Sequence, residues 1–157
     1  MTPNKEDYLK CIYEIGSRHK KITNKEIAQL MQVSPPAVTE MMKKMLAEEL
    51  LVKDKKAGYL LTDLGLRLVS DLYRKHRLIE VFLVNHLGYS TDEIHEEAEV
   101  LEHTVSERFV ERLDAMLQYP KTCPHGGTIP AKGELLDEEN QLTLEEASAP
   151  GDYIIKR

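Results

Sequence analysis

The amino-acid sequence predicts a mainly α-helical chain, with an N-terminal winged helix-turn-helix, a second helical domain and the incomplete start of a small β domain. Three observations lead to this fold class. A proline-capped helix follows a shorter helix and a tight turn within the first fifty residues, and two short β segments with a lysine-rich tip come next. Apolar residues then recur at helical spacing to residue 117. We place the three parts at residues 1–63, 64–140 and 141–157.

Three helices are expected in the first part. The first fits residues 4 to 18, and the second begins at residue 23 or 24. Ser34 suits an N-cap and the two prolines after it suit a first helical turn, so a third helix is expected from 35 to 48. Two short helices joined by a tight turn to a capped third helix are the pattern of a helix-turn-helix.

A β-hairpin is expected directly after the third helix. Residues 50–54 and 59–62 are short apolar β segments, joined by the turn Lys55-Lys56-Ala57-Gly58. A hairpin with a lysine-rich tip in this place is the wing of a winged helix.

The winged helix predicts contacts with double-stranded DNA. A recognition helix enters the major groove and contacts base edges near its N-terminus, while lysines contact phosphates. The candidate residues are Ser34, Pro36, Ala37, Thr39, Glu40, Lys43 and Lys44 on the third helix, with Lys53, Lys55 and Lys56 on the wing. The alternatives are a winged helix that binds protein and lysines that only solvate an exposed face.

The charge of the chain is divided unevenly. Residues 1–77 carry 15 Lys and Arg against 10 Asp and Glu, whereas residues 78–157 carry 6 against 17, so a net +5 and a net −11 make the total of −6. This asymmetry indicates a basic half for a polyanion and an acidic half for cations, and the alternative is an uneven surface charge without a function.

Three more helices are expected in the acidic half. Thr62 caps a long helix that runs to about Leu87, and the pattern Ser90-x-x-Glu93 predicts a capping box that opens the next. Ser106 caps the last, whose apolar stripe has little obvious partner within the chain, so a homodimer interface is expected there. That stripe consists of Phe109, Val110, Leu113, Met116 and Leu117. Residues 119–133 are expected to form a loop, and residues 153–157 a β-strand.

The acidic half also has the pattern of a divalent-metal site. On a helix, His95, Glu99, Glu102 and His103 share one face, and His76 and Glu80 share another. Imidazole and carboxylate together suit first-row divalent ions. Cys123 and His125 add a thiol and an imidazole in a proline-containing loop. The alternative is that these residues form a solvated surface and a turn, and Cys11 is expected to be a core residue.

Several classes of protein are excluded by the composition. No apolar stretch approaches the ~18 residues of a membrane helix, and the N-terminus has no apolar signal segment, so a cytoplasmic protein without membrane contact is expected. The two distant cysteines indicate neither a disulfide framework nor a zinc knuckle. A di-metal enzyme remains a rival, but no Glu has a His three residues later, as such helical bundles favour.

Four segments resemble the diphtheria toxin repressor family of metal-dependent regulators, with closest similarity to the manganese-responsive branch of Gram-positive cocci. The segments begin at Glu6-Asp7-Tyr8-Leu9, Val33-Ser34-Pro35-Pro36, Arg74-Lys75-His76-Arg77 and Glu99-x-x-Glu102-His103. The resemblance implies a DNA-binding repressor of metal-uptake genes that acts as a homodimer, with an SH3-like domain often following.

The resemblance also implies two metal sites. The primary site would use Asp7, Glu99, Glu102 and His103, and the ancillary site His76, Glu80 and His95, with Cys123 and His125 joining Glu80 or replacing part of that set. Iron-responsive members have Met in place of Asp7 and Cys in place of Glu99, so the two hard oxygens here favour Mn²⁺ over Fe²⁺ or Zn²⁺.

Two departures from the family affect what can be carried over. The smaller manganese regulators have Glu where this chain has Lys10, so their paired-manganese arrangement is not carried over. Iron-type members have Gln where Glu40 stands, so their operator preference is not carried over either. We expect metal to tie Asp7 of the DNA-binding domain to the acidic helix, and so to fix the spacing of the two recognition helices of a dimer.

Overall fold

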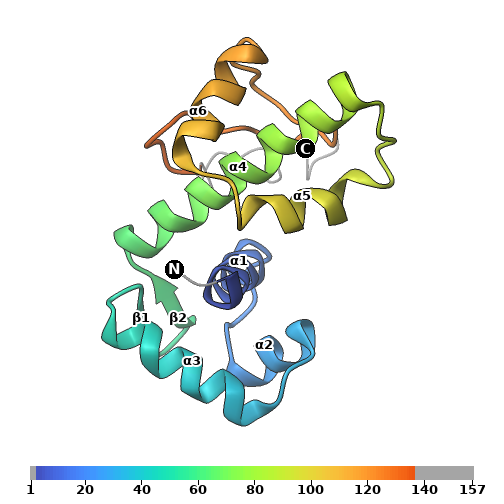
Figure 1. Ribbon diagram of the computed structural model, residues 1–157. Coiled ribbons are helices and arrows are strands. Elements are labelled where there is room, and N and C mark those ends of the chain that lie inside the picture. Colours follow the sequence, from blue (N-terminus) through green and yellow to red (C-terminus); the bar gives the residue numbers. More distant parts are fainter. Residues whose placement is uncertain (1–2, 137–157) are drawn as a thin grey trace, which may run out of the picture. The chain divides into compact units, whose positions relative to one another are not determined.

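The computed structural model describes residues 3–136, which fall into two units that divide between Val69 and Ser70. The predicted mainly helical fold with an N-terminal winged helix is confirmed for these residues (Figure 1). The β-strand predicted at 153–157 and the β-domain start predicted at 141–157 lie outside them. No helix within residues 3–136 is both long enough and apolar enough to span a membrane.

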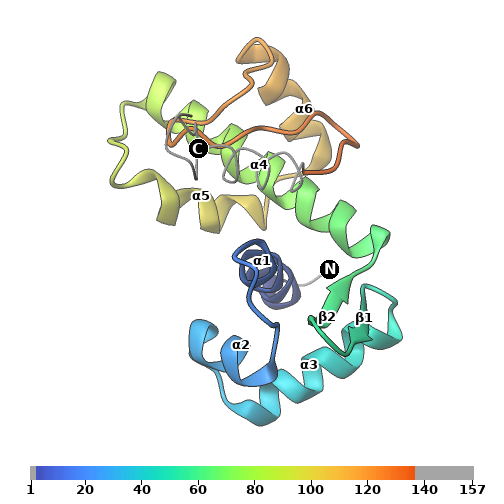
Figure 2. The ribbon, with the colours of Figure 1, turned by 180° about the vertical axis from the view of Figure 1, so that it is seen from behind.

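The first unit contains three helices and a hairpin. They are α1 (Pro3–Ser17), α2 (Asn24–Met31), α3 (Pro35–Ala47), β1 (Leu51–Asp54) and β2 (Gly58–Leu61). Within this unit, α2 lies on one side of α1 and the hairpin on the other, with α3 beneath both (Figures 1 and 2). The apolar sides of these elements form its core, which includes Tyr8, Ile12, Ile27 and Met45.

Side-chain caps set the start of the helix-turn-helix elements as predicted. The Thr23 hydroxyl accepts a hydrogen bond from the Glu26 amide at 3.1 Å, and the Ser34 hydroxyl accepts one from the Ala37 amide at 3.3 Å. These bonds satisfy amides that the first helical turn leaves without partners. Gln32 ends α2 in a left-handed conformation, so the chain turns sharply into α3.

The wing is an antiparallel pair whose tip is fixed by hydrogen bonds. Leu51 pairs with Leu61 and Asp54 with Gly58. The Asp54 carboxylate accepts hydrogen bonds from the amides of Lys56 and Ala57 at 3.0 and 2.7 Å. The wing therefore presents its lysines on a turn that is held by its own side chain.

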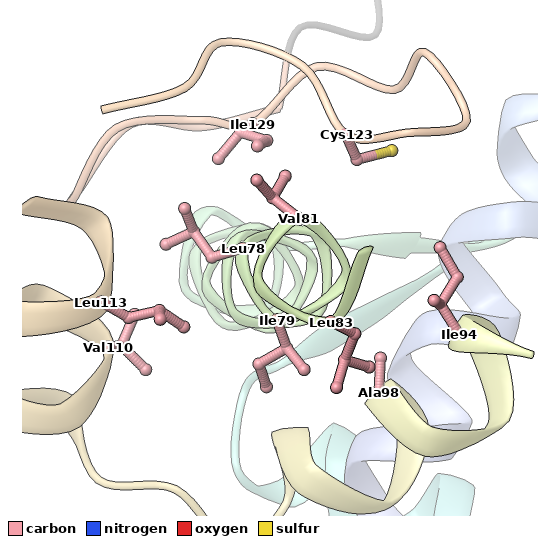
Figure 3. Close-up of a cluster of buried hydrophobic side chains, with 10 residues drawn as sticks. All are labelled: Leu78, Ile79, Val81, Leu83, Ile94, Ala98, Val110, Leu113, Cys123 and Ile129. Atoms are coloured by element: carbon pink, nitrogen blue, oxygen red, sulfur yellow. The ribbon is translucent and has the colours of Figure 1, made fainter. Parts of the chain in front are cut away.

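The second unit is built around the long helix α4 (Asp63–Leu87), which begins in the first unit. The Thr62 hydroxyl caps it by accepting from the Gly65 amide at 3.1 Å, as predicted. The other helices are α5 (Ile94–Glu102) and α6 (Glu107–Met116). Figure 3 shows α4 with α5 and α6 on different sides and the loop after α6 across a third side. The core cluster between them consists of Leu78, Ile79, Val81, Leu83, Ile94, Ala98, Val110, Leu113, Cys123 and Ile129.

Two sequence predictions about these helices were wrong in part. Ser90 and Glu93 do contact each other, at 2.8 Å, but residues 91–93 form a turn and α5 begins only at Ile94. The stripe on α6 is divided: Val110 and Leu113 are buried in the core cluster, whereas Phe109 and Met116 are about half exposed. The first error arises because the Ser90–Glu93 bond closes a local turn instead of capping a helix.

A buried ion pair also joins α4 to α6. The guanidinium Nη2 of Arg74 lies 2.8 Å from Asp114 Oδ2, and the Arg74 side chain is 4% exposed. The remaining guanidinium nitrogens, Nε and Nη1, are buried with no hydrogen-bond partner in the part of the chain that the structure describes.

Candidate metal centre and DNA-binding surface

Glu80 lies at the centre of a cluster of metal-binding side chains in the second unit. Its carboxylate is buried on α4, and Oε2 lies 3.0 Å from Nε2 of His76, one turn earlier on the same helix. The same oxygen lies 3.5 Å from Nδ1 of His125 in the loop after α6, and 3.9 Å from Nδ1 of His95 on α5. One buried carboxylate oxygen is thus approached by three imidazoles from three segments.

The surroundings of Glu80 favour its charged form. Burial by itself raises the pKa of this carboxyl, but hydrogen bonding and charge interaction with His76, the His125 imidazole and a hydrogen bond from Cys123 outweigh burial, so that the pKa is lowered. A carboxylate that stays charged in a buried place is well suited to bind a cation.

A second carboxylate, Glu102 on α5, contacts the other side of His76. Its Oε1 lies 2.6 Å from Nδ1 of His76, and Glu102 is only 1% exposed. Its Oε2 lies 3.6 Å from Nε2 of His103, and Glu99 on the same helix lies 3.8 Å from Nε2 of His95. His76 therefore joins the donors around Glu80 to those around Glu102.

The donor atoms of this unit are close enough together to share a divalent ion. Three groups each offer ligand atoms within 4.8 Å of one another: His76 with Glu80 and His95; Glu80 with Cys123 and His125; and His76 with Glu99 and Glu102. The first and third groups offer nitrogen and oxygen, which suit Mn²⁺ and Fe²⁺, whereas the second adds a sulfur, which suits Zn²⁺. The residues present thus fit a first-row divalent metal.

Protons compete with a metal for His76. An ionised carboxylate only accepts hydrogen bonds, so His76 can satisfy both Glu80 and Glu102 only when both of its ring nitrogens carry protons. Metal ligation requires a neutral imidazole, so a metal at His76 would displace the proton that one of these two hydrogen bonds needs.

The structure places eight of the nine predicted metal ligands in the second unit. These are His76, Glu80, His95, Glu99, Glu102, His103, Cys123 and His125. The ninth, Asp7, lies on α1 of the first unit, and its place in the primary site remains a prediction. Sequence reasoning assigned His76 to the ancillary set only and missed its contact with Glu102, because the two are 26 residues apart and helical spacing reveals only pairs on one helix.

All ten predicted DNA contacts lie on the surface of the first unit. Seven are exposed on α3 and at its N-cap, and three are exposed on the wing: Ser34, Pro36, Ala37, Thr39, Glu40, Lys43, Lys44, Lys53, Lys55 and Lys56. The Thr39 hydroxyl donates to the Pro35 carbonyl at 3.1 Å, so its remaining capacity toward a base is as an acceptor. The other face of α3, with Val38, Met41 and Met45, is buried.

The architecture matches a known family over both units. Residues 1–59 match the model described as "Iron dependent repressor, N-terminal DNA binding domain", and residues 62–131 match "Iron dependent repressor, metal binding and dimerisation domain". The chain belongs to the iron-dependent repressor family. It is a metal-dependent transcriptional repressor with a DNA-binding and a dimerisation domain, and the prediction that it is no enzyme is confirmed by the family.

Individual relatives place the chain within this family. It is 33% identical to the HTH-type transcriptional regulator MntR of Geobacillus kaustophilus over 118 residues, which are 75% of this chain and 83% of that protein. It is 86% identical to the manganese-activated repressor ScaR in its apo form, with a TM-score of 0.80, over 85% of this chain and 63% of ScaR. The structure of ScaR with bound Cd²⁺ is 83% identical to this chain and has a TM-score of 0.86, over 98% of this chain and 72% of ScaR. The chain thus spans roughly two thirds of the ScaR length.

Proposed function

We propose that this protein is a cytoplasmic, Mn²⁺-activated repressor that binds an operator as a homodimer and controls genes for metal-ion uptake. In this proposal residues 1–63 bind DNA, and residues 64–140 bind metal and dimerise. The observation that supports it best is the buried arrangement Glu80–His76–Glu102, which gathers hard donors from α4 and α5 in a family of metal-dependent repressors.

The choice of manganese rests on the donors and on the relatives. Asp7, Glu99 and Glu102 supply carboxylate oxygens to the primary set, and His103 supplies one nitrogen, which is a set without sulfur. ScaR, with 86% identity, is described as manganese-activated. The Cys123 thiol near Glu80 makes a Zn²⁺- or Fe²⁺-responsive regulator the second candidate.

Charge provides the coupling between metal and DNA. Without a cation, the carboxylates of Asp7, Glu99 and Glu102 repel one another when brought together, which opposes the DNA-competent arrangement of the two units. A bound divalent ion supplies the opposite charge. Its binding must favour that arrangement by a few kcal/mol to act as a switch.

The exposed part of the α6 stripe supports a homodimer. Phe109 and Met116 are 47% and 50% exposed, although two apolar residues of the same stripe are buried. A second copy that covers these side chains would remove apolar surface from water. A dimer also places two recognition helices about one helical turn of DNA, ~34 Å, or a multiple of it, apart.

Operator binding titrated with metal tests this function. A duplex selected by the full chain from a random-sequence library in Mn²⁺ is the probe for gel shifts with Mn²⁺, Fe²⁺, Zn²⁺ and chelator. We expect binding that needs Mn²⁺ and disappears with chelator. Asp7→Ala and Glu102→Ala should raise the Mn²⁺ concentration required more than tenfold, by removing a ligand.

Glu96→Ala is the matched control, because Glu96 is exposed on α5 and belongs to none of the ligand sets. Operator binding that persists unchanged in chelator would refute the proposal. Equal losses in all three variants would refute the ligand assignment. Activation by Zn²⁺ or Fe²⁺ at lower concentrations than Mn²⁺ would favour the second candidate.

A further inference from the structure

Cys123 and His125 lie in a loop of residues 121–129 that belongs to no helix or strand, yet the loop has a defined internal structure. Thr122 and Thr128 form an antiparallel bridge, and the Ile129 amide donates to the Lys121 carbonyl at 2.9 Å. The tip is closed by the Cys123 amide, which donates to the Gly127 carbonyl at 2.8 Å, and by the Gly127 amide, which lies 3.3 Å from the Cys123 sulfur. The loop thus behaves as one small hairpin whose position sets that of the thiol.

Arg77 holds this hairpin at its second arm. Its guanidinium donates to the Thr128 carbonyl, and its Cζ lies 4.7 Å from the centroid of the Tyr73 ring. A Cβ added to Gly127 would lie only 3.0 Å from Cζ and Nε of Arg77. The planar group is therefore in contact with an aromatic ring and with the backbone at Gly127, where a side chain would force the guanidinium to shift by a few tenths of an ångström.

Arg77, its aromatic neighbour Tyr73 and the Glu80 carboxylate share one face of α4. Tyr73, Arg77 and Glu80 are spaced by four and three residues, which places them one after another along the helix. The loop crosses α4 on the side of Leu78 and Val81, with Cys123 and Ile129 toward the helix (Figure 3). Arg77 fixes one arm of the hairpin, while the tip brings Cys123 and His125 to Glu80 about one helical turn further on.

We propose that Arg77, in contact with Tyr73 and Gly127, is a positioning residue for the metal set Glu80–Cys123–His125. It touches no metal and acts through the loop backbone. The inference rests on the proposed function, in which these three residues ligate a divalent ion. Groups that orient ligands typically contribute about 10- to 100-fold in metal affinity.

Titration of the full chain with Cd²⁺ alone tests this role. Cd²⁺ bound to a thiolate absorbs in the ultraviolet by charge transfer, so the band reports the Cys123 set directly. We expect a wild-type band that Cys123→Ser abolishes. Arg77→Lys keeps the charge but loses the planar stacking, and Gly127→Ala adds a methyl group against the guanidinium. Both should weaken the Cd²⁺ affinity read from this band about 10- to 100-fold.

The matched control is Arg67→Lys, because Arg67 is an exposed arginine on the same helix. Gly127→Ala retains Arg77, so it keeps the test valid if Arg77→Lys fails to fold. Thermal unfolding of the metal-free variants distinguishes the positioning role from a purely structural one. A purely structural role would lower the unfolding temperature without changing the Cd²⁺ affinity of the folded protein.

Two results would overturn the inference in distinguishable ways. If Arg77→Lys and Gly127→Ala bind Cd²⁺ like Arg67→Lys while Cys123→Ser loses the band, the positioning role of Arg77 is refuted and the ligand set stands. If wild type gives no band, or a band that survives Cys123→Ser, then Cys123 is not a ligand. In that case the positioning role falls together with this part of the proposed function.

Discussion

Replacing Gly58 with alanine is expected to detach the wing from the segment that precedes α2. Gly58 has φ +83°, and a Cβ added there would lie 2.0 Å from the Ile22 carbonyl oxygen. A Cβ cannot remain so close to a backbone oxygen, so the hairpin must move by about 1 Å, the gap to the 3.0 Å limit of such contacts. This movement breaks the hydrogen bond from the Ile22 amide to the Ala57 carbonyl, which is 2.8 Å long.

The size of the effect follows from these contacts. A left-handed backbone costs a non-glycine residue about 1–2 kcal/mol, and loss of the Ile22–Ala57 hydrogen bond costs about 1 kcal/mol. A loss of about 2–3 kcal/mol lowers the docked population of the wing relative to the undocked one roughly 30- to 150-fold. If Lys55 and Lys56 each lose one phosphate contact in both subunits of a dimer, the slope of log affinity against log salt falls by about 3–4.

Fluorescence anisotropy with a labelled operator, at several salt concentrations in Mn²⁺, measures both quantities. Gly133→Ala is the matched control, since Gly133 has φ +80° but nothing within 4 Å of an added Cβ, and it lies in the second unit. We expect Gly133→Ala to keep the wild-type slope. A Gly58→Ala protein with wild-type affinity and slope would refute the assigned role of the wing.

Three other changes have defined expected outcomes. Asp114→Asn should lower the free energy of unfolding by about 3–5 kcal/mol in denaturant titrations, because the buried Arg74 guanidinium loses the charge of its ion-pair partner. Arg74→Met should lower the free energy of unfolding less, and equal decreases in the two variants would contradict this reasoning. The lowered pKa of Glu80 means that its carboxylate stabilises the metal-free fold above the ordinary carboxyl pKa, and that this contribution is lost as the pH falls through the lowered value. Glu80→Gln should therefore unfold more easily than wild type at neutral pH and approach it in acid, so a pH-independent gap in unfolding free energy would be evidence against this. Burial raises the pKa of the Cys11 thiol to about 11, which leaves roughly one thiolate in a thousand at about pH 8. In Cys123→Ser, Cys11 should therefore resist alkylation until the protein unfolds, and rapid labelling of the folded protein would count against its burial.

Local signals in the sequence predicted most of the helix starts. Ser34 and the prolines after it, Thr62, and Ser106 each mark a helix whose cap depends on residues within one turn, and all three caps are present. Ser90 and Glu93 have the spacing of a helix cap, but their side chains close a turn before α5. The hydrogen bond between the two side chains is compatible with a capped helix and with a turn. Spacing along the chain does not distinguish these two outcomes.

Contacts between distant segments could not be predicted in the same way. The stripe on α6 was expected to lack partners, but Val110 and Leu113 pack on Leu78 and Ile79, more than thirty residues earlier. Likewise, helical spacing predicted the pair His76–Glu80 but not the contact of His76 with Glu102. The contact of Arg77 with the loop of residues 121–129 also depends on tertiary structure. The sequence does not show that the Arg77 guanidinium lies against Gly127.

In the proposed function, one metal ion takes ligands from both units of the chain. The most direct test of this arrangement is a crystal of the full chain grown with Mn²⁺ and examined by anomalous scattering at the manganese edge. We expect a peak within bonding distance of the carboxylate of Asp7 as well as of Glu102 and His103. Anomalous density on Glu102 and His103, with Asp7 turned to solvent, would contradict it.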